Sequence, residues 1–114
     1  MLSSTTALLN RNAPVFDWYT MPESYSAPLV RQAMDEFMPN RVASGRGTVL
    51  DPFCGAGTTL VAARLERYNA LGVEVNPFLC FASRVKSRDR FDLPLLRLET
   101  EKLLQCGMRN GRIG

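Results

Sequence analysis

Two carboxylates and two glycines stand where two short β-prone runs of the chain end. Asp51 closes the first run, and Glu74 lies 23 residues later, near the end of the second. Gly55 and Gly57 follow Asp51 and let the backbone turn sharply and approach a ligand without a Cβ in the way. A helix starting at about Thr58 would point its free N–H groups over this turn. Because an acidic residue after the second strand of such a unit accepts hydrogen bonds from ribose hydroxyls, the pattern indicates a nucleoside-bearing ligand.

The turn lacks the residues that bind phosphate groups. No lysine or arginine occurs from residue 47 to residue 63, which excludes a GxxxxGK[ST] loop. A GxGxxG fingerprint would need a third glycine where Leu60 stands. The carboxylate of Asp51 would oppose a pyrophosphate, whereas it suits a ligand with an ammonium and a sulfonium group. These residues therefore favour S-adenosyl-L-methionine over NAD or ATP as the cofactor.

The elements that must position these residues follow from periodicity and from capping residues. We predict half of a doubly wound α/β sheet, that is, an incomplete parallel sheet of the Rossmann type. In chain order we expect a helix from Ser26 to Pro39, a strand over 48–51, the glycine turn, a helix over 60–67, a strand over 70–75, a helix opened by Asn76 and Pro77, and a last helix from Pro94 to about Gln105 that Gly107 stops.

Apolar spacing also predicts which helix residues face the core. Met34 and Phe37 recur at helical spacing in the first helix, and Phe78 and Phe81 do so in the helix after Pro77. We divide the chain into a flexible arm over 1–15, a cofactor-binding portion over 16–107 and a tail over 108–114. The aromatic pair Trp18 and Tyr19 either seals the first helix against the sheet or stacks on a base.

Composition excludes several classes of protein. A chain with 46% hydrophobic and 22% charged residues fits a single soluble domain. The absence of histidine excludes a Ser-His-Asp triad, and the three cysteines form no CxxC pair, so we expect no metal and no disulfide framework. We expect no membrane span and no signal peptide, and hence a cytoplasmic protein. A net charge of +3 permits a polyanionic partner without requiring one.

Three segments resemble motifs of one enzyme family. The run Val-Leu-Asp-Pro-Phe-Cys-Gly-Ala-Gly-Thr-Thr over 49–59 resembles the first motif of DNA methyltransferases that modify cytosine N4 or adenine N6. The run Leu-Gly-Val-Glu-Val-Asn-Pro over 71–77 is similar to their second motif, and residues 25–30 resemble the cofactor motif that precedes the first one in permuted members. The resemblance implies a class I methyltransferase fold, S-adenosyl-L-methionine as cofactor and DNA as the substrate of the complete enzyme.

The resemblance also implies a role for individual residues. Tyr25 and Ser26 would close over the methionine end of the cofactor, Glu74 would bind its ribose, and Val75 and Asn76 would flank its adenine. The methionine half would lie on the first motif, with its residues Asp51, Pro52, Phe53, Cys54, Gly55, Gly57 and Thr58.

Two residues of the first motif also admit other interpretations. Phe53 fits a core position as well as a cofactor contact. Cys54 lies beside a helix N-terminus, which lowers the pKa of a thiol, but no base accompanies it. A small side chain under the cofactor therefore fits Cys54 better than a nucleophile does.

The sequence departs from the family at the catalytic motif. These enzymes hold the target amine with an (Asp/Asn/Ser)-Pro-Pro-aromatic motif, and this chain contains no Pro-Pro dipeptide. We therefore assign no catalytic residue, expect the chain alone to be inactive, and expect residues beyond Gly107 or a complementary chain to supply the motif. Two alternatives stay open: part of an RNA guanine-N2 methyltransferase, and a non-catalytic cofactor-binding module. The basic residues over 84–90 either contact phosphates or form a solvated helix end.

Overall fold

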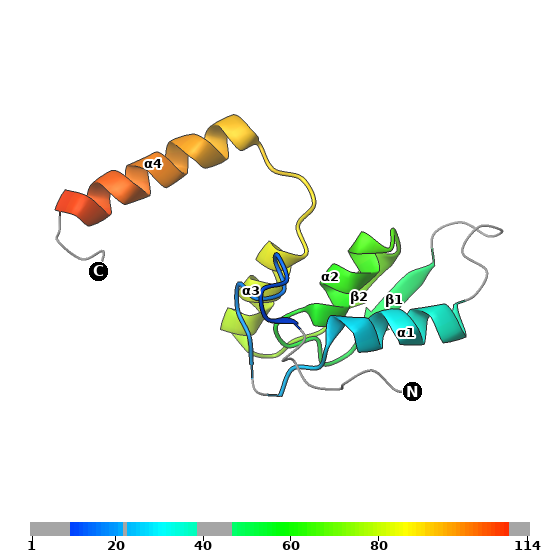
Figure 1. Cartoon of the computed structure of the whole chain (residues 1–114). Helices are drawn as coiled ribbons and strands as arrows, with labels where there is room; N and C mark the ends of the chain where they lie inside the picture. Colours follow the sequence, from blue (N-terminus) through cyan, green and yellow to red (C-terminus); the bar gives the residue numbers. More distant parts are fainter. Residues whose placement is uncertain (1–9, 22, 39–46, 110–114) are drawn as a thin grey trace.

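The computed structural model describes residues 10–21, 23–38 and 47–109 of the chain. These residues form four helices and two strands, joined by turns and loops. The fold is a small α/β arrangement, as predicted (Figure 1). The elements follow in the order α1 (Ala27–Phe37), β1 (Thr48–Asp51), α2 (Thr58–Leu65), β2 (Asn69–Gly72), α3 (Pro77–Lys86) and α4 (Leu93–Arg109).

The two strands form a parallel pair joined by the crossover helix α2. Their register runs from Thr48 opposite Asn69 to Asp51 opposite Gly72. Within the described residues the sheet has these two strands, which is consistent with a partial Rossmann-like fold (Figure 1). The second strand ends at Gly72 rather than at residue 75 as predicted. Val73 follows the strand and still bonds to the other side: its N–H donates to the carbonyl of Asp51 at 2.9 Å, and its carbonyl accepts from the N–H of Cys54 in the glycine turn at 3.0 Å.

The core lies on one face of this sheet. Val49 and Ala70, which are opposite each other in the register, pack against a buried cluster that comes from α1 and α2 together with Phe16 and Tyr68. Leu50 and Leu71, the next pair, point to the other face because side chains alternate along a strand. These two leucines are 60% and 57% exposed, so the described residues leave that face uncovered.

Some helix residues that periodicity placed in the core are exposed. Met34 is buried as predicted, whereas Phe37, Phe78 and Phe81 are 77%, 54% and 64% exposed. Trp18 is 60% exposed and does not seal α1 against the sheet. The prediction was wrong at these positions because periodicity identifies an apolar face, while burial also needs a neighbouring element. The described residues cover these side chains little: Phe78 makes an edge-to-face contact with Tyr19, with ring centroids 5.1 Å apart, and is still more than half exposed.

Two side chains attach the N-terminal residues to the body. Asn10 is 2% exposed; its amide donates to the carbonyl of Tyr25 at 3.0 Å, and its Oδ1 accepts from the N–H of Ala27 at 2.8 Å. Lys86, buried at the end of α3, donates from Nζ to the carbonyls of Phe16 and Tyr19, both at 3.1 Å. The part of the expected arm that the structure describes, residues 10–15, therefore lies against the core. Residues 1–9 and 110–114 fall outside the described residues, so the arm there and the tail stay predictions.

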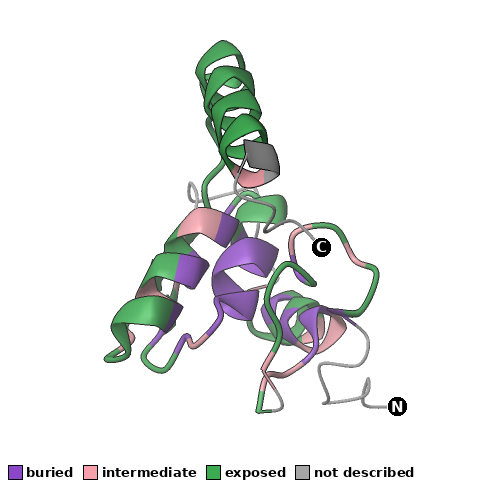
Figure 2. Cartoon of the chain, turned by 90° about the vertical axis from the view of Figure 1, so that its left-hand side faces the viewer, coloured by how far each residue is buried: buried purple, intermediate pink, exposed green. Residues whose placement is uncertain are grey.

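The last helix, α4, stands apart from the other elements. It starts at Leu93, where the Asp92 side chain accepts from the N–H of Leu95 at 3.0 Å, and it continues through Gly107, where we expected it to stop. Its side chains from Leu93 to Cys106 are all exposed, and α4 packs on no other described element (Figure 2). In the described part of the chain no helix is both long and apolar enough to cross a bilayer.

Candidate cofactor-binding site

The turn between β1 and α2 depends on two glycines with positive φ. Gly55 has φ +47°, and Gly57, the residue before α2, has φ +87°, a region that other residues rarely adopt. Gly57 also packs closely on α3, since a Cβ there would lie 2.8 Å from the Cβ of Ser83. The turn is closed by a hydrogen bond of 2.7 Å from the N–H of Gly57 to the carbonyl of Cys54.

The carboxylate of Glu74 joins this turn to the loop after β2. Its Oε2 accepts from the N–H of Gly55 at 3.0 Å, and its Oε1 accepts from the N–H of Asn76 at 2.8 Å. A carboxylate offers about four lone-pair positions, so Glu74 keeps capacity for two further donors. The structure therefore brings together the acid and the glycine turn that the sequence predicted as neighbours.

Tyr25 links three elements through its hydroxyl group. The hydroxyl donates to Oδ2 of Asp51 at the end of β1 and contacts Oγ1 of Thr59 in α2. Asp51 is 9% exposed, and its Oδ1 accepts from the N–H of Phe53 at 3.1 Å. Burial, together with the adjacent Asp51 carboxylate, raises the pKa of the Tyr25 hydroxyl above its ordinary value of 10, so the group remains a donor at neutral pH.

A pocket of about 190 Å³ opens at the carboxyl ends of the two strands. Its lining includes two carboxylates, those of Glu23 and Glu74, and no lysine or arginine. Ligands of open α/β sheets bind at this edge. The lining residues are Met21, Glu23, Ser24, Tyr25, Phe53, Cys54, Gly55, Ala56, Thr58, Glu74 and Leu79.

Six of the twelve predicted site residues line this pocket: Tyr25, Phe53, Cys54, Gly55, Thr58 and Glu74. Phe53 is 85% exposed, so the interpretation of Phe53 as a core residue was wrong. Cys54 is 6% exposed, and burial raises the pKa of its thiol, which argues against a thiolate nucleophile and fits a small packed side chain.

The other six predicted residues do not line the pocket. Ser26 is fully buried and caps α1 by accepting from the N–H of Leu29 at 3.3 Å, and Asn76 caps α3 in the same way. Gly57 ends the turn and packs against Ser83 of α3, and Asp51 contacts the pocket residue Tyr25 but does not line the pocket. Both remaining residues, Pro52 and Val75, lie exposed on the surface, Val75 at 94%.

Five residues that line the pocket were not predicted from the sequence. Ala56 lies inside the predicted turn, and Leu79 lies in the first turn of the helix opened by Asn76, so both follow from motifs already identified. Met21, Glu23 and Ser24 come from an irregular segment before Tyr25, where no periodicity marks a wall of a pocket. The described residues contain no group of three side chains that could hold a metal ion.

A parallel strand pair, a glycine turn before the crossover helix and an acid after the second strand make a small α/β structure that is consistent with a partial Rossmann-like fold. Comparison with known families makes the assignment specific, because a family model described as DNA methylase matches residues 18–84. The chain belongs to this N6/N4 DNA methylase family, as the motifs predicted, and the family uses S-adenosyl-L-methionine.

Curated relatives are type II methyltransferases. M.BsoBI of Geobacillus stearothermophilus is 33% identical over 78 residues, which cover 68% of this chain and 14% of that protein. M.MjaII of Methanocaldococcus jannaschii is 30% identical over 73 residues, which cover 64% of this chain and 13% of that protein. M.AvaI of Nostoc is 35% identical over 68 residues, which cover 60% of this chain and 13% of that protein. The matched part of the chain thus spans about one seventh of these relatives, and no solved structure matches the chain.

Proposed function

We propose that this chain is the cofactor-binding portion of a DNA methyltransferase that transfers a methyl group to N4 of cytosine or N6 of adenine. The observation that carries the proposal is the position of Glu74. Its carboxylate lines the pocket, is held by the N–H groups of Gly55 and Asn76, and retains acceptor capacity for two ribose hydroxyls.

The chemistry of the pocket fits S-adenosyl-L-methionine better than it fits a phosphate-bearing nucleotide. Two carboxylates and no cation line it, so a ligand with a sulfonium and an ammonium group meets opposite charge there. Tyr25 and Gly55 would lie along the methionine half, and the exposed Val75 and the capping Asn76 would flank the adenine. When bound, the cofactor supplies a methyl group activated by the positive charge on sulfur.

At about 190 Å³, the pocket is smaller than the roughly 300–1,000 Å³ typical of ligand sites. A ligand of this size class would extend across the pocket rim, where Phe53 is exposed.

The target base needs residues that these 114 do not contain. The sequence has no Pro-Pro dipeptide, so the clamp for the amine and the stacking aromatic would come from further residues or from a complementary chain. The second edge of β1 is unpaired within the described residues, and the turn that follows β1 supplies Phe53, Cys54 and Gly55 to the pocket. An added parallel strand at this edge would bring a catalytic motif close to the cofactor.

A second candidate function follows from the absence of a Pro-Pro dipeptide in this sequence. The chain would bind the cofactor without transferring a methyl group, as a non-catalytic accessory module. The RNA guanine-N2 alternative has less support, because the matching family model describes a DNA methylase and because Glu74 is followed by Asn76 and Pro77, as in the DNA-modifying family.

Calorimetric titration of the chain with S-adenosylhomocysteine, NAD and ATP tests the cofactor assignment. We expect binding of S-adenosylhomocysteine and at least tenfold weaker binding of the other two; equal affinity for ATP would contradict the proposal. The genomic sequence after codon 114 separates the two candidates. A Pro-Pro-aromatic motif in frame supports the methyltransferase, whereas a gene that stops there, without a neighbouring gene for the motif, supports the accessory module.

A further inference from the structure

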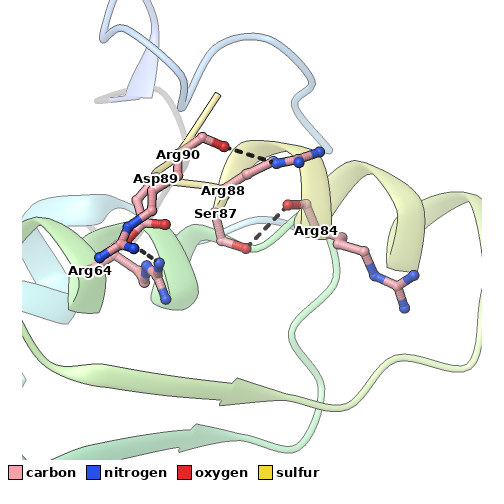
Figure 3. A network of polar contacts seen from close by, with 6 residues as sticks. All are labelled: Arg64, Arg84, Ser87, Arg88, Asp89 and Arg90. Carbon is pink, nitrogen blue, oxygen red and sulfur yellow. Dashed lines mark hydrogen bonds and ion pairs between the residues drawn. The ribbon is translucent and has the colours of Figure 1, made fainter. Parts of the chain in front are cut away.

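Three arginines lie in the last turn of α3 or within four residues after it, and we call them the arginine cluster: Arg84, Arg88 and Arg90. All three are exposed. Figure 3 shows the guanidinium groups of Arg84 and Arg88 pointing in different directions from the helix end, while Arg64 of α2 lies beside Asp89. None of the three lines the pocket beside Glu74.

The charges of the cluster are not neutralised within the described residues. Asp89 is the one acidic residue between Arg84 and Arg90, and its carboxylate pairs with Arg64 instead (Figure 3). The ammonium of Lys86 points inward to backbone carbonyls and so does not share this surface. The described carboxylates form no ion pair with the cluster, which leaves three positive charges facing the solvent.

One member of the cluster is held in place before any ligand binds. The Nε of Arg88 donates to the carbonyl of Arg90 at 3.0 Å, and its guanidinium lies 5.4 Å from the ring centroid of Phe91. These two contacts fix the plane of the guanidinium while its terminal nitrogens stay available. A fixed planar fork matches the two oxygens of a phosphate, and it loses less side-chain entropy on binding than a free arginine does.

We infer that the arginine cluster binds the phosphate backbone of duplex DNA, as a contact separate from the cofactor pocket. The inference rests on the proposed function, which supplies DNA as the partner; the uncompensated charge and the fixed guanidinium supply the site. Helix α3 starts at Pro77, beside the pocket, and its ten residues place the cluster about 15 Å further along. Variants of the cluster therefore leave the pocket intact.

Cations at a helix C-terminus also stabilise the helix, and this is the competing explanation for the cluster. The two roles differ in what salt does. If the cluster contacts three phosphates, the logarithm of the association constant for DNA falls with the logarithm of the salt concentration at a slope of about −2.7. Binding then weakens about 40-fold between 50 and 200 mM salt. A role confined to helix stability gives no such dependence of DNA affinity.

The test measures fluorescence anisotropy of a labelled 20-base-pair DNA of mixed sequence with the full 114-residue chain, at several salt concentrations. Arg88→Ala/Arg90→Ala is compared with Arg97→Ala/Lys102→Ala, which removes the same charge from exposed positions of α4. We expect the cluster variant to bind at least tenfold more weakly at 50 mM salt and its slope to fall to about −0.9. The α4 variant should stay within twofold of the parent chain. Arg88→Lys/Arg90→Lys keeps the charge and should recover most of the salt slope.

Equal losses in the two alanine variants, or no loss in either, would overturn the inference. Duplex RNA bound tenfold more tightly than duplex DNA would overturn the choice of partner. Titration with S-adenosylhomocysteine separates failure of the inferred DNA contact from failure of the proposed cofactor-binding function. A cluster variant that binds the cofactor normally shows an intact fold, and a parent chain that binds DNA through the cluster but never binds the cofactor contradicts the proposed function alone.

Discussion

The hydroxyl group of Tyr25 donates a hydrogen bond to the carboxylate of Asp51, although 26 residues separate the two in the chain. The bond joins the segment before α1 to the end of β1, and the contact with Thr59 adds the first turn of α2. The wall of the pocket and the tip of the sheet are therefore held together at one hydroxyl group.

Removing this hydroxyl should destabilise the protein. Tyr25→Phe leaves Oδ2 of the buried Asp51 and Oγ1 of Thr59 without this partner, so we expect the free energy of unfolding to fall by about 1–3 kcal/mol. Urea unfolding followed by circular dichroism measures the change. Tyr19→Phe is the matched control, because the hydroxyl of Tyr19 forms no hydrogen bond within the described residues. Equal effects of the two substitutions would show that the Tyr25 hydroxyl contributes nothing specific.

The same hydroxyl predicts a loss of stability at alkaline pH. The pKa of Tyr25 is raised in the folded state, so its contribution is fully present below the unfolded value of 10 and declines as the pH rises from there toward the folded value. The stability of the parent chain should therefore fall more steeply above pH 10 than that of Tyr25→Phe. Burial lowers the pKa of Lys86, which gives a pH dependence of opposite sign, but both proteins share it. Parallel pH profiles would contradict the role of the hydroxyl.

Glu74→Ala should weaken cofactor binding. The substitution removes the proposed ribose contact, and a hydrogen bond to a charged group contributes about 1.5–3 kcal/mol, so the affinity for S-adenosylhomocysteine should fall tenfold or more. Glu99→Ala, an exposed carboxylate of α4, is the control and should bind like the parent chain. Calorimetry gives both affinities, and a folded Glu74→Ala protein with unchanged affinity would rule out the ribose assignment.

The two glycines of the turn should differ in how they tolerate alanine. Both have positive φ, which costs roughly 1–2 kcal/mol for an alanine. At Gly57 the new Cβ would also lie 2.8 Å from Ser83, whereas at Gly55 the nearest atom is Sδ of Met21, at 3.8 Å. We expect Gly57→Ala to lose clearly more stability than Gly55→Ala in urea unfolding. A larger loss for Gly55→Ala would show that α2 and α3 do not pack as the structure has them.

The chain alone should not methylate DNA. Without a Pro-Pro-aromatic motif, no clamp aligns the target amine with the methyl group, and alignment provides much of the rate of such a transfer. Incubation of the purified chain with tritiated S-adenosyl-L-methionine and mixed-sequence DNA measures the transfer. Incorporation above that of an Asp51→Ala control would mean that these residues contain an amine site of another kind.

The part of the site that the sequence could predict is the part encoded by local geometry. Gly55, Gly57 and Glu74 were identifiable because a sharp turn needs positive φ and because the spacing between two parallel strands places the acid beside it. Met21 and Ser24 were not, because an irregular segment becomes a pocket wall only through tertiary contacts.

In the fold, too, local features could be predicted from the sequence and tertiary contacts could not. The order of helices and strands followed from periodicity, but the exposure of Phe78 depends on which element covers α3, which no local pattern encodes. The helix α4 passes through Gly107 because a glycine costs a helix only about 1 kcal/mol relative to alanine, too little to end it without a proline or a cap.

The uncovered sheet face has a thermodynamic consequence. Among the residues that the structure describes, Leu50 and Leu71 expose an apolar surface beside a strand edge without a partner, and such surfaces associate with one another as molecules become more concentrated. Association of folded chains withdraws them from the unfolding equilibrium by mass action, so the thermal midpoint should rise with protein concentration. The stability of this chain is then a function of how much of it is present, and variants compare fairly only at one common concentration.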